Sequence, residues 1–176
     1  MQIRSTTEND AGEIRRLYHA AFPEGEAGAV AKLAVDLLAE RTTPPVLSLV
    51  AELDGHVAGH VAFSRVTIDG MGGESYLLAP LAVLPEAQKR RIGSDLVESG
   101  VRQLADRGAR VVFVYGDPSY YGRFGFTAAA AERFVPPYPL KYPFGWQGLA
   151  LDGGDPSAGE PARFDCLAPL CDPSLW

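Results

Sequence analysis

The sequence is poor in cysteine, which limits the metal and disulfide chemistry open to it. Only Cys166 and Cys171 occur in 176 residues. A disulfide framework needs more cysteines in a shorter chain, and a structural zinc site needs about four ligands. We therefore expect two free thiols and no metal site.

Long apolar runs are also absent. No stretch approaches the roughly 20 apolar residues that span a bilayer, and the first ten residues, MQIRSTTEND, lack the apolar core of a secretory signal. These absences predict a cytoplasmic protein with no membrane partner.

The chain has no excess of basic charge. Its 16 Lys and Arg residues are outnumbered by 22 Asp and Glu residues, for a net charge of −6. A protein that binds nucleic acid normally shows a basic stripe, so we expect no nucleic-acid partner. The single dense basic cluster, Lys89–Arg91, suits a small phosphate-bearing ligand better than a duplex.

The composition that remains is that of a folded protein. Hydrophobic residues make up 47% of the chain and charged residues 22%, which is enough apolar surface for a sizeable core. The length suits one domain, and no linker or internal repeat interrupts it. We expect a single domain over residues 1–176.

The spacing of apolar residues predicts an α+β fold, in which helices flank a β-sheet. A capping pattern from Thr7 to Asp10 precedes one helix that ends at Pro23, and an Asp54-Gly55 pair predicts a tight hairpin turn. Further helices are predicted at 26–40 and 92–106, and strands at 2–4, 46–53, 57–68, 75–83, 109–115, 147–151 and 162–167. The strand 75–83, the helix 92–106 and the strand 109–115 form a βαβ unit, which predicts one parallel pair.

The segment from Leu78 to Ser94 places a buried strand, a short basic loop and a helix start in succession. Backbone N–H groups at a helix start are unpaired and carry positive dipole, so such a turn binds anions. Gly93 would let the backbone approach a pyrophosphate closely. On spacing alone, the alternative is a solvated basic loop before an ordinary helix.

This segment resembles the acetyl-CoA motif of the GNAT superfamily of N-acetyltransferases. That motif reads L-x-V-x-P, then Q/R-x-x-G-x-G/A and a helix. Gln88 matches its first position and Gly93 its last, whereas Arg91 stands where the first glycine is expected. An arginine there is strained if the position needs a positive φ.

The resemblance implies a GNAT fold, whose mostly antiparallel twisted sheet splays at its one parallel pair of strands. It also implies acetyl-CoA as co-substrate. We expect the turn and the end of the preceding strand to bind it, through Leu81, Ala82, Val83, Gln88, Lys89, Arg90, Arg91, Ile92, Gly93 and Ser94.

A second signature lies at Tyr115–Phe126. GNAT proteins commonly carry a tyrosine four residues before a Gly-Phe pair, and Tyr121 stands in that relation to Gly125-Phe126. The segment is similar to a bacterial subgroup of predicted N-acetyltransferases. The resemblance implies that Tyr121 protonates the departing coenzyme A thiolate; the alternative is a packing tyrosine whose hydroxyl reaches the backbone.

The general base is less well determined. Glu74 precedes the central strand, and Glu24 and Glu26 lie in the connection between the first two helices; a chain of water molecules is an equal alternative. The histidines His19, His56 and His60 are expected at the surface or at an interface rather than at a metal.

These features predict an N-acetyltransferase that moves acetyl from acetyl-CoA to a primary amine of a small molecule or peptide. Two alternatives stay open: a non-catalytic acetyl-CoA-binding regulatory module and an aminoglycoside-type antibiotic acetyltransferase. The aromatic segment Phe134–Gly148 is expected either to line the acceptor side or to pack on the sheet. The acceptor and the oligomeric state, including a homodimer, are not determined by the sequence.

Overall fold

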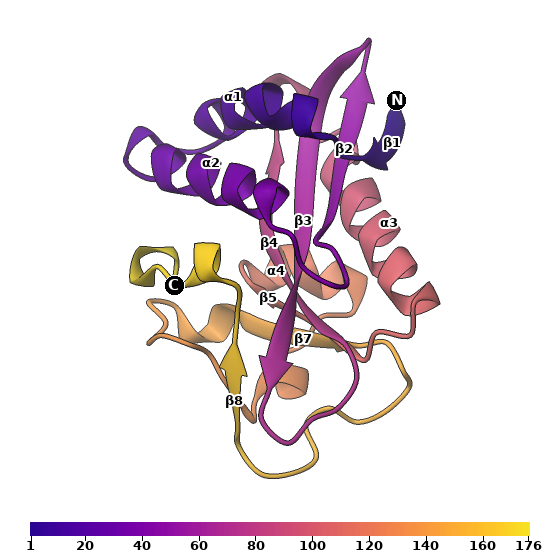
Figure 1. The fold of residues 1–176 in the computed structure, drawn as a ribbon, viewed down its shortest axis with the longest axis vertical. Coiled ribbons are helices and arrows are strands. Elements are labelled where there is room, and N and C mark those ends of the chain that lie inside the picture. Colours follow the sequence, from indigo (N-terminus) through magenta and orange to yellow (C-terminus); the bar gives the residue numbers. More distant parts are fainter. The chain divides into compact units, whose positions relative to one another are not determined.

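The structure, a computed structural model, describes all residues from 1 to 176 (Figure 1). It has the predicted α+β architecture: a mostly antiparallel sheet with one parallel pair, flanked by helices. Six strands follow the order β1-β2-β3-β4-β5-β7, and β8 joins β3 and β6 away from that path. The strands are β1 Gln2–Ser5, β2 Leu47–Leu53, β3 His56–Ile68, β4 Ser75–Val83, β5 Val111–Tyr115, β6 Phe134–Val135, β7 Trp146–Ala150 and β8 Ala162–Asp165.

Four α-helices accompany the sheet: α1 Ala11–Ala21, α2 Glu24–Ala39, α3 Ile92–Asp106 and α4 Pro118–Tyr121. The predicted bounds of α3 are confirmed, and α2 begins two residues earlier than predicted. The tight turn between β2 and β3 is also confirmed, since Asp54 and Gly55 have φ of 53° and 82°, as a two-residue hairpin turn requires.

Contacts along the chain group it into two compact units. One comprises residues 1–63 and 79–100, and the other residues 64–78 and 101–176. The prediction of a single domain stays a prediction.

In the first unit, α1 and α2 lie side by side over β2 and β3 (Figure 1). Their apolar faces pack on the sheet in one buried cluster that includes Ile14, Leu17, Ala31 and Val50. The start of α3 packs closely on β3 because Gly59 has no side chain: a Cβ there would lie 2.8 Å from Ile92.

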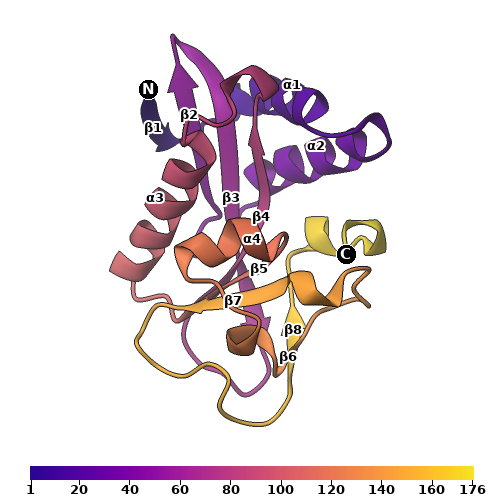
Figure 2. The same ribbon diagram turned by 180° about the vertical axis from the view of Figure 1, so that it is seen from behind.

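The second unit is built around β5, which pairs in parallel with β4 and antiparallel with β7. An aromatic cluster fills its interior, where Phe113 stacks on Trp146 with ring centroids 5.5 Å apart and meets Phe164 edge-on at 5.3 Å. The short strand β6 runs beside β8 (Figure 2).

The parallel pairing of β4 with β5 runs from Ser75↔Val111 to Leu78↔Val114 and stops there. β4 continues to Val83, whereas β5 ends one residue later, at Tyr115. The last five residues of β4 therefore have no partner in β5. This is expected for two parallel strands that separate after their first paired residues.

Candidate functional site: a loop-to-helix turn and a tyrosine segment

The turn from Gln88 to Ser94 links a short 3-10 helix, Pro85–Ala87, to α3. Two of its residues have left-handed backbones: Lys89 with φ of 60° and Arg91 with φ of 65°. Arg91 is the residue that replaces the expected glycine, so this position does require a positive φ. Left-handed residues that alternate along a turn point successive N–H groups inward and form an anion-binding concavity.

The backbone donors of this turn are unpaired within the protein. From Lys89 to Ser94, no N–H group donates to a protein acceptor, and the first helical bond runs from Asp95 N–H to the Arg91 carbonyl at 2.9 Å. The macrodipole of α3 adds partial positive charge at the same place.

The side chains of the turn divide into two groups. Lys89, Arg90 and Arg91 are exposed, whereas Ile92, Gly93 and Ser94 are buried. The Arg91 guanidinium lies 3.6 Å from Asp95 and 3.4 Å from Glu98 on the surface of α3. Exposed cations and a row of free N–H groups thus lie on the same turn, a combination that suits a phosphate-bearing anion.

The turn is connected to the end of β4 by a side-chain hydrogen bond. Gln88 donates from Nε2 to the Val83 carbonyl at 3.3 Å, which joins the turn to the end of β4. Within Leu81–Val83, Ala82 is buried and its two neighbours are half-buried. The predicted binding residues of this unit thus lie in two short segments, 81–83 and 88–94, that the Gln88 hydrogen bond joins.

The tyrosine segment belongs to the second unit. Asp117 caps α4 by accepting from the Ser119 N–H at 2.8 Å, and this short helix carries Tyr121 at its end. The ring meets those of Tyr120 and Phe126 edge-on, with centroids 5.0 and 5.9 Å away. It also packs directly on Gly116, where a Cβ would lie 2.4 Å from the Tyr121 Cε2 atom.

The Tyr121 hydroxyl makes no hydrogen bond within the protein, so the alternative in which it reaches the backbone is not observed. Burial, together with the neighbouring Tyr120 phenol, raises the pKa of Tyr121 well above its usual value. The hydroxyl therefore holds its proton at neutral pH and is suited to donate rather than to accept.

The three candidate carboxylates have different surroundings. Glu74 precedes β4 and accepts a hydrogen bond from the Tyr76 hydroxyl at 2.8 Å, whereas Leu81–Val83 lie at the opposite end of that strand. Glu24 and Glu26 are exposed in the first turn of α2. Within the second unit, no hydrogen bond joins Glu74 to Tyr121.

The prediction for His60 is wrong, while His19 and His56 are exposed as expected. His60 has no exposed surface, because α1 covers its face of β3. Its Nδ1 lies 2.8 Å from the Tyr18 hydroxyl and its Nε2 2.8 Å from the Ser48 hydroxyl. Burial lowers the pKa of His60 to about 3, with Asp10 acting weakly in the opposite direction, so the ring is neutral.

The aromatic segment Phe134–Gly148 combines buried and exposed rings. Trp146 is buried and donates from Nε1 to the Phe134 carbonyl at 3.0 Å, whereas Tyr142 and Phe144 are 51% and 67% exposed. One part of the segment thus packs in the second unit, and its tip presents aromatic surface to solvent.

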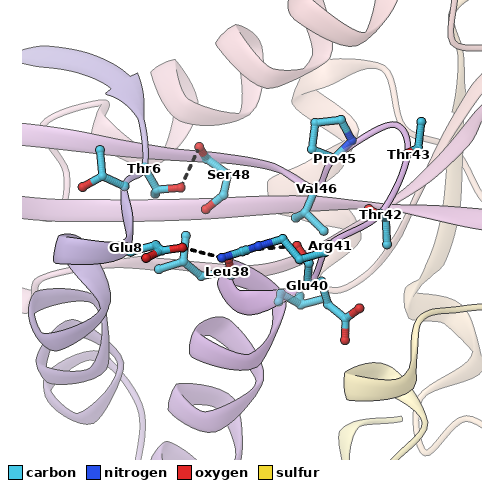
Figure 3. A pocket seen from close by; sticks show the side chains of 12 residues that line it. Thr6, Glu8, Leu38, Glu40, Arg41, Thr42, Thr43, Pro45, Val46 and Ser48 are labelled. Carbon is cyan, nitrogen blue, oxygen red and sulfur yellow. Dashed lines mark hydrogen bonds and ion pairs between the residues drawn. The ribbon is translucent and has the colours of Figure 1, made fainter.

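A separate hollow of about 450 Å³ lies in the first unit beside the end of α2. Figure 3 shows Glu8 and Arg41 pointing toward each other in it as an ion pair, and Thr6 donating to the Ser48 carbonyl at 3.3 Å. None of the predicted binding or catalytic residues lines this hollow.

No group of three or more His, Cys, Asp or Glu side chains is placed to hold a metal ion. None of the helices combines the length and the apolar character needed to cross a bilayer.

The sequence profile of the acetyltransferase (GNAT) family matches residues 12–126, which include both the turn and the tyrosine segment. This chain belongs to the GNAT family. The prediction of an acyl-CoA-dependent acetyltransferase is thereby confirmed at the level of the family.

Relatives among curated proteins support this membership. The chain is 37% identical over 138 residues to the uncharacterized N-acetyltransferase YjhQ of Escherichia coli K12, covering 77% of this chain and 75% of that protein. It is 38% identical over 131 residues to the uncharacterized N-acetyltransferase YhbS of the same strain, covering 74% and 75%.

Solved structures agree. The E. coli YhbS structure, determined in complex with CoA, has a TM-score of 0.83 at 31% identity and covers 97% of this chain and 92% of its own. A GNAT acetyltransferase from Brucella melitensis in complex with acetyl-CoA has a TM-score of 0.73 at 34% identity, with 96% of each chain covered.

Gly116 positions the ring of Tyr121, a relation that the sequence analysis did not predict. The signature containing it was recognised, but no role follows from the letters alone. Only the structure shows that the ring of Tyr121 occupies the space where a side chain would stand.

Proposed function

We propose that this protein transfers the acetyl group of acetyl-CoA to a primary amine of a small molecule or a peptide, by direct attack of the amine on the thioester. The observation that carries the proposal is the Tyr121 hydroxyl, which is protonated and has no protein partner. Such a hydroxyl can act as a general acid that protonates the leaving thiolate.

The turn Gln88–Ser94 supplies the binding part of the proposal. Its free N–H groups and its exposed cations hold the pyrophosphate, and the end of β4 at Leu81–Val83 orients the thioester. Acetyl-CoA itself supplies an activated acyl group. Positioning it beside an amine provides much of the rate acceleration, so no nucleophilic serine or cysteine is required.

Tyr121 supplies the proton. As coenzyme A departs, the hydroxyl donates to the sulfur, and the tyrosine regains its proton from solvent after product leaves. Burial penalises the tyrosinate, but it penalises a thiolate in the same surroundings as well. The raised pKa of Tyr121 is therefore compatible with transfer to that sulfur.

The base that takes the proton from the amine is proposed among Glu26, Glu74 and a chain of water molecules. Glu26 is preferred over Glu74, because its carboxylate is exposed and makes no hydrogen bond, whereas Glu74 is held by Tyr76. An amine that reaches the site already deprotonated needs neither carboxylate.

The test is acetyl transfer to a panel of primary amines that includes polyamines, peptides with free N-termini and aminoglycosides. Product is measured by mass spectrometry and coenzyme A by chromatography, since thiol reagents would also react with the exposed Cys171. Amine-dependent product is the expected result.

Acetyl-CoA binding by calorimetry without transfer to any amine would contradict the proposal and favour the regulatory module. Transfer to aminoglycosides alone would favour the antibiotic-modifying alternative.

A further inference from the structure

The two cysteines of the chain lie together near the end of the second unit. Cys166 follows β8, Cys171 follows a 3-10 helix at Ala168–Leu170, and the two Sγ atoms are 3.9 Å apart. Both are free thiols; Cys171 is exposed and Cys166 is half-buried. A disulfide needs an S–S distance of about 2.05 Å, so the sulfurs must approach by only about 2 Å.

Both thiols line one hollow of about 340 Å³. Its wall also contains Tyr138, the cationic Arg163 and the anionic Asp165. A small polar molecule can therefore reach the half-buried sulfur as well as the exposed one, and a charged peptide-like molecule meets groups of both signs there.

We propose that Cys166 and Cys171 form a reversible intramolecular disulfide by exchange with a low-molecular-weight disulfide such as oxidised glutathione. In the first step, the Cys171 thiolate attacks one sulfur of oxidised glutathione. A mixed disulfide forms, the glutathione S–S bond breaks, and the released thiolate takes up the proton that Cys171 lost.

In the second step, the Cys166 sulfur attacks the Cys171 sulfur. The internal S–S bond forms, the mixed disulfide breaks, and a second glutathione leaves with the proton of Cys166. The two protein thiols are oxidised by two electrons in total, and one glutathione disulfide is reduced to two glutathione molecules.

The order of the two steps follows from the surroundings of each sulfur. Burial and the neighbouring Cys171 raise the pKa of Cys166 to about 12, so its thiolate is rare and reacts poorly with a molecule from solution. At 3.9 Å from Cys171, however, the same sulfur is held next to its target, and proximity compensates for the small thiolate fraction.

The disulfide would restrain a turn that holds Trp176. The ring closed between the cysteines contains Leu170, whose carbonyl accepts from the Trp176 Nε1 at 3.0 Å. Trp176 in turn stacks on Tyr115, with centroids 6.3 Å apart and planes at 9°. Oxidation therefore stiffens the segment that covers the end of β5.

The experiment treats the reduced full-length protein with oxidised glutathione, blocks the remaining thiols and measures intact and peptide masses. Wild type should lose the mass of two hydrogen atoms, keep no titratable thiol, and recover both thiols with a reductant. Cys166→Ser should stop with one glutathione on Cys171. Cys171→Ser should react at least about 10-fold more slowly than wild type, because only the buried sulfur remains.

A native wild type that ends with one or two bound glutathiones, or that does not react although its urea-unfolded form does, would overturn the proposal. Hydrogen exchange tests the restraint: residues 168–176 should exchange more slowly in oxidised than in reduced wild type, with no such slowing in treated Cys166→Ser. Equal exchange in the two wild-type forms would overturn the restraint.

Discussion

The turn Gln88–Ser94 and the segment Gly116–Phe126 differ in where the groups that we propose to act are located. They belong to the backbone in the turn and to a side chain in the segment. In the turn, the groups proposed to bind acetyl-CoA are backbone N–H donors, and the left-handed positions are occupied by Lys89 and Arg91 rather than by glycine. In the segment, the group proposed to act is the single hydroxyl of Tyr121, whose ring fits only because Gly116 has no Cβ.

The two segments should therefore respond differently to substitution. A backbone site keeps its donors when an exposed side chain is replaced, provided that the local backbone is preserved. A side-chain site is lost when one ring moves, even if its neighbours are all intact. A substitution that alters only the backbone of the turn, or only the position of the Tyr121 ring, therefore distinguishes the two kinds of site.

The largest effect is expected for Gly93→Val. A branched side chain in the first turn of α3 would stand between the backbone donors and the pyrophosphate, so the Kd for acetyl-CoA should rise about 100-fold, equivalent to about 2.7 kcal/mol. Isothermal titration calorimetry measures this directly, with Lys89→Ala expected to change the Kd much less.

Gly12→Val is the matched control, because Gly12 is also the second residue of a helix and a Cβ there meets nothing within 4 Å. Its affinity should equal that of wild type. A normal Kd for Gly93→Val would show that the backbone at this position does not approach the ligand.

Gly116→Ala should damage the side-chain site and leave the turn intact. The new Cβ would lie 2.4 Å from the Tyr121 ring, so the ring must move, at a cost of about 1–3 kcal/mol in the free energy of unfolding. We expect kcat to fall about 10-fold or more while the acetyl-CoA Kd stays unchanged, since a displacement of about 1 Å can cost that much or more.

The control here is Gly122→Ala, where the added Cβ has open space and the backbone is helical with φ of −57°. Denaturant unfolding should show this variant to be as stable as wild type or slightly more so. Equal stability and activity for Gly116→Ala would mean that the ring position is not set by this glycine.

His60→Gln tests whether burial keeps the His60 imidazole uncharged in the folded protein. In the unfolded chain histidine titrates near 6.5, whereas burial lowers the pKa of folded His60 to about 3. Between these values the unfolded chain binds a proton that the folded protein does not, so stability falls as pH falls, by up to about 1.4 kcal/mol per pH unit.

Unfolding by urea between pH 6.5 and 4.5 should therefore show a steeper loss of stability for wild type than for His60→Gln. Asp10, whose pKa the Arg4 hydrogen bonds lower to about 2, contributes equally to both proteins and does not obscure the difference. Parallel slopes would mean that His60 is protonated in the folded protein.

The smallest effect concerns strain in the turn itself. Arg91 has φ of 65°, which costs an L-residue about 1–2 kcal/mol and glycine nothing, although glycine loses part of this advantage through the entropy of the unfolded chain. Arg91→Gly should thus be about 0.5–1 kcal/mol more stable than Arg91→Ala.

Both variants lose the same surface ion pairs, so their comparison isolates the backbone term. Chemical denaturation in the absence of ligand gives the difference. If the alanine variant were the more stable one, a left-handed backbone at this position would be ruled out.

Much of this fold could be predicted from periodicity and turn chemistry. The strand Ser75–Val83 and the helix Ile92–Asp106 have the predicted bounds, because each has an unbroken apolar period between strong stop signals. The helix Pro118–Tyr121 and the strand Phe134–Val135 were not predicted, since four and two residues are too short to show a period.

The site divides in the same way. The turn could be predicted from the sequence because it consists of a strand, a loop and a helix start that follow one another directly in the chain. The burial of His60 depends on which face of β3 is covered by α1. The position of the Tyr121 ring depends on Gly116, five residues earlier in the chain. Neither relation is encoded in local spacing, so neither could be read from the sequence.

The measurement that tests the central claim most directly compares Tyr121→Phe with wild type under conditions where chemistry limits the rate. The substitution keeps the ring and removes only the proton donor. We expect kcat and kcat/KM to fall together by about 10²–10³, the acetyl-CoA Kd to stay unchanged, and Tyr120→Phe to be much milder. Equal turnover by Tyr121→Phe and wild type would show that the thiolate leaves without Tyr121 and would contradict the account.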